Sequence, residues 1–322
     1  VPADDADARR KELSTEQVFD ILDQIADEGC LMLLLTGGEP LLRPDFLDIY
    51  DYAKRKGFLI TLFTNGTMVT PEVADHLQEW PPFLVEITLY GGTPETCERV
   101  TGVPGSYERC MHGIELLHAR GVPLRLKMVV TIRNRHEYGA VREYAQKLTG
   151  DFRHDAMLKP RPDGTKDVRA VRLTPPKVLA LDLADDRAKA SFSELAERLW
   201  DAPDTDDRLY ICGAGLRSFH IDAYGQLSPC ILSRYVSYDL MTGSFREGWQ
   251  DFLAQVRAQT VSPDFECRTC PWRAICGSCP AFAQMENGDP ETVVDFACQI
   301  GHLRAQTFGL EAQRARRSSI VD

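Results

Sequence analysis

Cysteine is the residue type whose spacing in this sequence points most directly to chemistry. Seven of the ten cysteines fall within residues 212–298, and four of them form a C-x2-C-x5-C-x2-C run. Thiolates held this close repel one another, and two cysteines separated by two residues share a metal more readily than they form an unstrained disulfide. The pattern predicts a metal-binding region with these ligands: Cys212, Cys230, Cys267, Cys270, Cys276, Cys279 and Cys298.

Three kinds of cysteine site fit this pattern to different degrees. A disulfide framework needs an oxidising compartment, and a chain of 322 residues does not need such cross-links to hold a core. A zinc ribbon uses C-x2-C pairs but usually separates them by more than the five residues found here. Seven ligands suit one site of four and one of three, and Cys-Pro pairs such as Cys270-Pro271 are common in iron–sulfur proteins. Iron–sulfur ligation is the favoured interpretation, and zinc is the main alternative.

Composition and charge are those of an ordinary globular protein. The chain has 322 residues, 43% of them apolar, a mean hydropathy of −0.26 and a net charge of −11. This length allows a main domain and a smaller appended one. No apolar run is long enough to cross a membrane, and the first ten residues lack the apolar segment of a signal peptide, so a cytoplasmic protein is predicted. The acidic balance argues against a nucleic-acid partner, which usually requires a basic face.

Apolar runs and helical patterns alternate through the first half of the chain. A capping box at Ser14 begins a helix that ends at Gly29, and the apolar run 31–36 is typical of a buried parallel strand. Four more helices are predicted, each followed by a strand; these strands are 59–64, 84–89, 124–131 and 152–158. Each crossover is long enough for a βαβ unit, so an α/β fold with a parallel sheet is predicted.

The second half of the chain is predicted to hold a smaller, cysteine-rich domain. An acidic linker over 201–207 marks the boundary. Beyond it we expect a hairpin that turns at Tyr224-Gly225, a helix within 243–256 and a C-terminal helix over 302–314. The predicted domains are residues 1–205, residues 206–310 and a tail over 311–322.

Two glycines and an acid follow the first predicted strand. Gly37 and Gly38 have no Cβ, so their backbone can come close to a ligand, and Glu39 can accept hydrogen bonds from an ammonium group. Polar residues also stand at or near the carboxyl ends of the next strands, where α/β folds place their sites. They are Asn65, Thr88 and Lys127, each of which is equally compatible with a turn or surface role.

These features together resemble a known enzyme family. Thr36-Gly37-Gly38-Glu39-Pro40 resembles the GGEP motif of radical S-adenosylmethionine (SAM) enzymes, and the cysteine region resembles their SPASM extension. The SPASM pattern is a cysteine, a Gly-x4-Cys, a C-x2-C-x5-C-x3-C run and a final cysteine. This chain matches it, with Gly225 before Cys230, except that two residues rather than three separate Cys276 and Cys279.

The resemblance implies a fold and a set of cofactors. The fold would be a partial (β/α)6 radical SAM barrel that lacks its first strand, followed by a SPASM domain with a β-hairpin and helices. The turn from Gly37 to Pro40 would bind the methionyl amine of SAM, with sugar or carboxylate contacts from Asn65, Thr88 and Lys127. Two auxiliary [4Fe-4S] clusters would be bound. Cys267, Cys270, Cys276 and Cys298 would hold one, and Cys212, Cys230 and Cys279 the other, which keeps an open iron site.

One motif of the family is absent from this sequence. The C-x3-C-x2-C loop, whose thiolates hold the cluster that cleaves SAM, occurs nowhere in the chain. The sequence begins at Val1, just after the point where that loop and the first strand would lie, which predicts a chain cut at its N-terminus. A third [4Fe-4S] cluster is expected only in the full-length protein.

The resemblance favours an enzyme that acts on a peptide. Such an enzyme generates a 5′-deoxyadenosyl radical from SAM and passes an electron through its auxiliary clusters. Its partners would be a peptide or small-molecule substrate and an electron donor such as flavodoxin or ferredoxin. We expect a ribosomal peptide or a peptide-derived cofactor precursor as substrate, with a haem precursor as a further possibility. Ile231 follows Cys230 where the sulfatase-maturing branch carries an Asp, so that branch is disfavoured.

A non-catalytic protein is the alternative from another class. It would bind iron–sulfur clusters or zinc for electron transfer or partner binding on a degenerate radical SAM scaffold. The retained turn from Gly37 to Pro40 argues against it, since a protein without SAM has no need of that turn. No catalytic acid or base can be named from the sequence.

Overall fold

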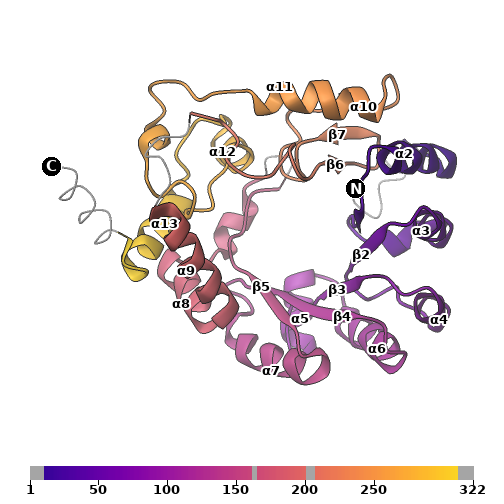
Figure 1. The fold of residues 1–322 in the computed structure, drawn as a ribbon. Helices are drawn as coiled ribbons and strands as arrows, with labels where there is room; N and C mark the ends of the chain where they lie inside the picture. The colour runs from indigo at the N-terminus through magenta and orange to yellow at the C-terminus, as the bar shows by residue number, and fades with distance from the viewer. Residues whose placement is uncertain (1–10, 162–164, 201–206, 311–322) are drawn as a thin grey trace. The chain divides into compact units, whose positions relative to one another are not determined.

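A computed structural model describes residues 11–161, 165–200 and 207–310 of the chain. The chain divides into two compact units (Figure 1). The first is Val1–Asp155 with Ala223–Gly225 and Leu240–Glu247, and the second is Ala156–Asp222 with Gln226–Asp239 and Gly248–Asp322. The predicted domain boundary after residue 205 and the predicted tail over 311–322 lie outside the described residues, so this division stays a prediction.

Five parallel strands form the sheet of the first unit, in the order in which they occur in the chain. They are β1 (Met32–Leu35), β2 (Leu59–Thr64), β3 (Leu84–Thr88), β4 (Leu124–Val129) and β5 (Phe152–Asp155). Every neighbouring pair is parallel. The predicted α/β class and parallel sheet are confirmed.

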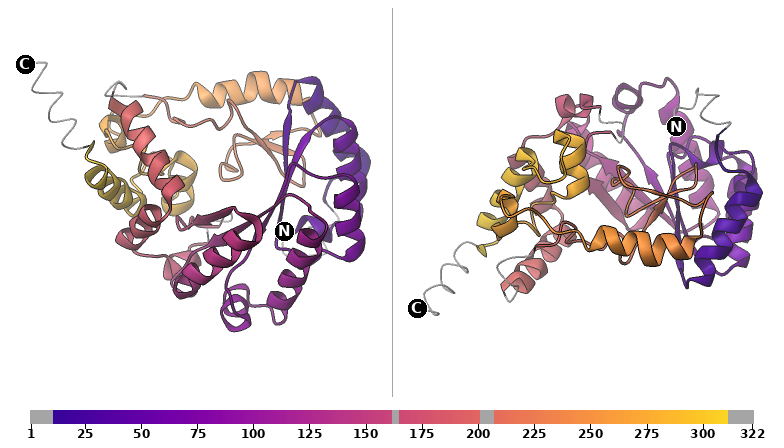
Figure 2. Two further views of the ribbon diagram at one scale, coloured as in Figure 1. Left: turned by 60° about the horizontal axis from the view of Figure 1, so that its bottom comes forward. Right: turned by 90° about the horizontal axis from the view of Figure 1, so that it is seen from above.

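Helices connect these strands, and α3, α4, α6 and α7 lie along one side of the sheet (Figure 1, Figure 2). The helices of this unit are α2 (Thr15–Asp27), α3 (Phe46–Arg55), α4 (Pro71–Glu79), α5 (Pro94–Thr101), α6 (Ser106–Ala119), α7 (Tyr138–Thr149) and the single turn α10 (Phe245–Glu247). Short 3₁₀ turns, η1 (Pro40–Leu42) and η2 (Arg135–Glu137), follow β1 and β4. The capping box at Ser14 is present. Helix α5 was not predicted, although Thr93-Pro94 offers an N-cap and a proline at the first helical position.

The two faces of this sheet differ in polarity. On the face that the helices cover, Ile60, Val85 and Leu126 are fully buried. The opposite face is called the inner face below. Side chains alternate along a strand and residues in register share a face, so the inner face carries Phe63, Glu86, Thr88, Arg125, Lys127 and Arg153.

The prediction that the first strand is buried is wrong for part of its length. Leu31, Met32 and Leu34 are 60%, 60% and 47% exposed. Strand β1 is the edge of the described sheet and pairs there with β2 alone. Within the described sheet, a neighbouring strand therefore covers the side chains of β1 on one edge only, which leaves them exposed.

The second unit combines a small antiparallel sheet with helices. The sheet contains β6 (His220–Ile221), β7 (Gln226–Ser228) and β8 (Tyr238–Asp239). The predicted hairpin is confirmed, and β8 adds a third strand to it. The helical segments are η3 (Asp167–Val171), α8 (Pro175–Ala184), α9 (Asp186–Trp200), the π-helical turn η4 (Gly248–Phe252), α11 (Leu253–Arg257), η5 (Glu266–Thr269), α12 (Pro280–Asn287) and α13 (Asp295–Thr307). The predicted C-terminal helix begins at Asp295 rather than at residue 302.

A buried arginine joins the helices of this unit to the cysteine run. Arg304 on α13 is 5% exposed, and its guanidinium donates hydrogen bonds to the carboxylate of Asp182 on α8 at 2.7 Å and to the carbonyl of Ile275 at 3.0 Å. These bonds fix the chain next to Cys276 against two helices. Among the described helices, none is both long and apolar enough to cross a membrane.

Candidate active site and cysteine sites

The carboxylate of Glu39 joins the end of β1 to the end of β2. Glu39 has extended backbone and caps η1, with its Oε1 accepting from the backbone N–H of Leu41 at 3.1 Å. The same oxygen accepts from the hydroxyl of Thr64 at 2.7 Å, and Oε2 accepts from the backbone N–H of Asn65 at 2.7 Å. Because a carboxylate offers about four acceptor positions, three donors leave room for about one more.

In the predicted SAM turn, Glu39 is held by three hydrogen bonds, and the space next to Gly37 is open. A Cβ built on Gly37 would meet no heavy atom within 4 Å, so open space borders this glycine. Gly37 and Gly38 are both exposed, and Pro40 begins η1. The turn thus offers exposed backbone, and the remaining acceptor position of Glu39, to a cationic or hydrogen-bond-donating ligand group.

The other predicted contact residues stand at neighbouring strand ends. The side-chain oxygen of Asn65 accepts hydrogen bonds from the backbone N–H and the hydroxyl of Thr67, so this oxygen is part of a local turn. Thr88 and Lys127 are in register on β3 and β4, both half-buried. The ammonium of Lys127 lies 6.0 Å from the centre of the Phe63 ring. The structure therefore places these residues along one edge, and their roles toward SAM stay predictions.

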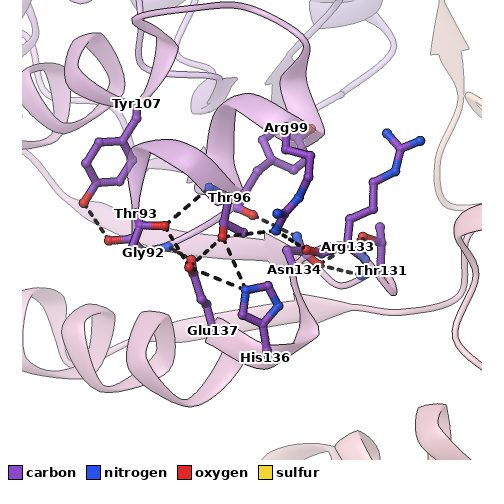
Figure 3. Close-up of polar contacts among 11 residues, drawn as sticks. Gly92, Thr93, Thr96, Arg99, Tyr107, Thr131, Arg133, Asn134, His136 and Glu137 are labelled. Atoms are coloured by element: carbon purple, nitrogen blue, oxygen red, sulfur yellow. Dashed lines mark hydrogen bonds and ion pairs between the residues drawn. The ribbon is translucent and has the colours of Figure 1, made fainter.

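A polar cluster that the sequence did not reveal joins the loops after β3 and β4 (Figure 3). The carboxylate of Glu137 accepts from the backbone N–H of Gly92 at 2.6 Å, the hydroxyl of Thr93 at 2.8 Å and the hydroxyl of Thr96 at 2.6 Å. Burial alone would raise the pKa of Glu137, but these hydrogen bonds outweigh it and hold the pKa below its usual value. Glu137 therefore acts as an ionised clamp between two loops.

Asn134 completes this connection from the second loop (Figure 3). Its side-chain amide donates to the carbonyls of Tyr90 and Val129, both at 2.9 Å, and its oxygen accepts from the backbone N–H of Thr131 at 2.7 Å. Asn134 is fully buried. The loop after β3, with Tyr90 and Gly92, is thus held to the loop after β4 by the side chains of Asn134 and Glu137. These partners lie more than 40 residues apart along the chain.

Four of the predicted cysteine ligands line one pocket in the second unit. The pocket is small and partly open to solvent. Its lining includes Cys267, Cys270, Cys276 and Cys298, together with Trp272 and His302. Burial comes first among the causes that raise the pKa of Cys267 to about 11, followed by the nearby thiols of Cys270, Cys276 and Cys298. These thiols need a positively charged partner to become thiolates together.

The other three predicted ligands, Cys212, Cys230 and Cys279, do not line this pocket. Burial raises the pKa of the Cys279 thiol, and Cys230 and Cys212 raise it further, whereas the ammonium of Lys159 lowers it. Cys279 caps α12, and its sulfur accepts from the backbone N–H of Phe282 at 3.4 Å. The assignment of these cysteines to two ligand sets stays a prediction.

The chemistry of this donor set fits an iron–sulfur cluster. Among residues 11–161, 165–200 and 207–310, no three His, Cys, Asp or Glu side chains converge closely enough to hold a metal ion as they stand. Zinc would need four sulfurs at about 2.3 Å from one point. Four cysteine thiolates are the usual ligands of a [4Fe-4S] cluster. The remaining cysteines, Cys97 and Cys110, are buried on α5 and α6, and Cys30 follows α2.

Known proteins are similar to this chain over most of its length. The radical SAM superfamily matches residues 3–145. An AdoMet-dependent heme synthase of Methanosarcina barkeri is 26% identical over 299 residues, which cover 86% of this chain and 85% of that protein. The mycofactocin maturase MftC of Mycobacterium ulcerans is 30% identical over 308 residues, covering 90% of this chain and 81% of that protein. The PqqA peptide cyclase of Streptomyces rochei is 26% identical over 306 residues, covering 92% and 84%.

A solved structure shares the fold. Native anSMEcpe with bound AdoMet matches this chain with a TM-score of 0.67 at 16% identity, covering 96% of this chain and 91% of the other. At that identity the likeness concerns the fold alone. The Mycobacterium ulcerans relative is similar over most of both chains. The superfamily match covers strands β1 to β4 of the parallel sheet. This chain therefore belongs to the radical SAM superfamily of enzymes.

Proposed function

We propose that this protein modifies a ribosomally made peptide, or a cofactor precursor derived from one, by radical SAM chemistry supported by two auxiliary [4Fe-4S] clusters. The observation that carries the proposal is the pocket lined by Cys267, Cys270, Cys276 and Cys298, whose lining does not include Cys212, Cys230 or Cys279. Two electron-carrying clusters suit an enzyme that must remove electrons from its substrate. In this assignment residues 206–310 form a SPASM-type domain and residues 1–205 the radical SAM core.

Membership of the superfamily brings SAM and a [4Fe-4S] cluster as cofactors, and these supply the 5′-deoxyadenosyl radical when bound. The chain's own residues would bind and orient SAM. The turn at Gly37 would receive the methionyl amine beside Glu39, and Lys127 would offer its ammonium to a carboxylate. Glu137 and Asn134 would hold the flanking loops in place, since their hydrogen bonds fix both loops beyond Thr88 and Lys127.

The names of two relatives support a peptide substrate. One is a maturase and the other a peptide cyclase, and both match over most of their length. A haem precursor is the second candidate, because the Methanosarcina barkeri relative is a heme synthase of similar identity and coverage. We place the reaction in the cytoplasm, where thiols stay reduced, with a flavodoxin or ferredoxin as electron donor.

Substrate turnover in the enzyme expressed from its complete gene tests this proposal. The enzyme would be incubated anaerobically with SAM and a reductant, either with candidate precursor peptides or with a haem precursor. We expect 5′-deoxyadenosine to form together with a peptide that has lost hydrogen, measured by mass spectrometry. Product from the haem precursor alone would contradict the peptide assignment.

A further inference from the structure

An arginine lines the four-cysteine pocket, which is the pocket that holds Cys267, Cys270, Cys276 and Cys298. This residue, Arg273, carries a positive charge across the whole physiological pH range. Among the described residues, no Asp or Glu belongs to the lining. The pocket therefore brings four thiols together with a permanent cation.

The guanidinium of Arg273 is held in place by two backbone carbonyls and an aromatic ring. One terminal nitrogen donates to the carbonyls of Arg208 and Leu209, at 3.0 Å each. The guanidinium carbon lies 5.5 Å from the centre of the Phe265 ring. Leu209 is buried in an apolar cluster against which Phe265 packs. Since carbonyl groups are neutral, these two hydrogen bonds position the charge without cancelling it.

The charge of Arg273 acts on the thiols of this pocket. Burial comes first among the causes that raise the pKa of Cys267, and the neighbouring thiols raise it further, whereas Arg273 lowers it by favouring the thiolate. Two acids act in the opposite direction: after burial and a neighbouring thiol, Asp295 and Glu266 raise the pKa of Cys298. Neither acid is part of the lining. Arg273 is thus the fixed charge that the wall of the pocket itself supplies.

A positive charge in this position favours electron uptake. Four thiolates make a [4Fe-4S] cluster anionic, and its reduction adds one more negative charge. A nearby cation attracts the reduced form more strongly than the oxidised form, so it raises the reduction potential. Burial strengthens this attraction because it lowers the local dielectric constant, and Cys276 is only 8% exposed.

We propose that the guanidinium of Arg273 raises the reduction potential of the [4Fe-4S] cluster in the four-cysteine pocket. This cluster then accepts an electron at a potential where the same cluster beside a neutral side chain stays oxidised. The role rests on the proposed function and deepens it, because electrons removed from a substrate need an acceptor. Arg273 acts through the cluster rather than on the substrate, so its effect is seen in a potential.

A reductive titration measures this potential directly. The protein with the numbered sequence would be purified anaerobically and titrated with dithionite, with the reduced clusters followed by electron paramagnetic resonance. Cys279→Ala lacks a predicted ligand of the other cluster and therefore tells the two signals apart. We expect Arg273→Gln to lower the potential of the four-cysteine cluster by about 59 mV or more, a tenfold change in the ratio of oxidised to reduced cluster. Arg273→Lys keeps the charge and should stay close to the native protein.

A second arginine provides the matched control. Arg268 follows Cys267 in the sequence, and its guanidinium pairs with Asp207 at 2.8 Å, but it does not line the pocket. Arg268→Gln therefore removes a positive charge from the same stretch of chain outside the pocket wall. It should leave the potential close to that of the native protein.

Two titration results would overturn the proposal. One is an unchanged potential in Arg273→Gln, and the other is an equal fall in Arg273→Gln and Arg273→Lys, which would assign the effect to hydrogen bonds and packing. Loss of the cluster from both variants would assign Arg273 to folding and would also overturn it. Loss from Arg273→Gln alone would support it, because only that variant lacks the charge.

The same preparations separate this inference from the proposed function. A native protein without iron would contradict both. Full iron content without a shift in Arg273→Gln would contradict the role of Arg273 alone. The expected shift, combined with an enzyme from the complete gene that never alters a peptide, would contradict the peptide function alone.

Discussion

The carboxylate of Glu39, after β1, accepts a 2.7 Å hydrogen bond from the hydroxyl of Thr64, the last residue of β2. Thr64 is 6% exposed, so water cannot replace this bond readily. The acid of the Gly37–Pro40 turn is thus held by the neighbouring strand before any ligand binds. The turn is preorganised by a residue that no motif identifies.

Thr64→Val should weaken SAM binding without touching the turn itself. The substitution removes one of the three donors to Glu39, and we expect a loss of stability of about 1 kcal/mol together with several-fold weaker binding. Isothermal titration of SAM into the enzyme expressed from its complete gene would measure the affinity. Thr64→Ser keeps the hydroxyl and should behave like the native protein; equal weakening by both variants would show that the hydroxyl is not responsible.

Loss of the Glu137 clamp should make the protein less stable in a pH-dependent way. The pKa of Glu137 is lower in the folded protein than in the unfolded chain, so its ionised form stabilises the fold. That contribution is complete above the ordinary pKa of glutamate and is lost as pH falls through the lowered value. Glu137→Gln should therefore cost about 2 kcal/mol near pH 7 and progressively less toward pH 3.

Urea unfolding of the native protein and Glu137→Gln at several pH values measures this difference. Glu95→Gln, on the exposed first turn of α5, serves as the control and should change stability little. A difference between native protein and Glu137→Gln that stayed constant from pH 7 to pH 3 would show that the clamp does not depend on an ionised acid.

Alanine substitutions at two helical glycines should change the stability of the protein in opposite directions. A Cβ on Gly113 of α6 would fall well inside contact distance of the carbonyl oxygen of Gly66, whereas a Cβ on Gly139 of α7 would meet nothing within 4 Å. We expect Gly113→Ala to destabilise the protein by about 3 kcal/mol or more. Gly139→Ala should stabilise it by up to about 1 kcal/mol, because alanine favours a helix. Equal effects in urea unfolding would mean that α6 does not pack against Gly66 as described.

Widening the contact between α13 and Cys276 should remove only the cluster that Cys276 is proposed to bind. A Cβ on Gly301 would lie 2.5 Å from the Cβ of Cys276, so Gly301→Ala must push that cysteine away from its pocket. We expect the variant to lose about four irons per chain and to keep the other cluster. Cys279→Ala should lose the complementary four. Loss of all iron in both variants would show that the two groups do not form separate sites.

Regular patterns in the sequence were enough to predict the sheet, because each of its strands, and each helix between them except α5, follows from local periodicity and its glycine or capping signals. The burial of side chains was predicted less well than the strands themselves. Met32 and Leu34 are as apolar as the residues of a core strand, and they are exposed because β1 lies at the edge of the described sheet. The Glu137 clamp was missed because its donors lie 41 to 45 residues away along the chain.

We assign two iron–sulfur clusters to the seven cysteines of residues 212–298. The most direct test is to measure iron, acid-labile sulfide and zinc per chain in anaerobically purified protein with the numbered sequence. About eight irons and about eight sulfides per chain are expected, from two [4Fe-4S] clusters. Stoichiometric zinc without sulfide would contradict it and leave a structural cysteine site on an α/β scaffold.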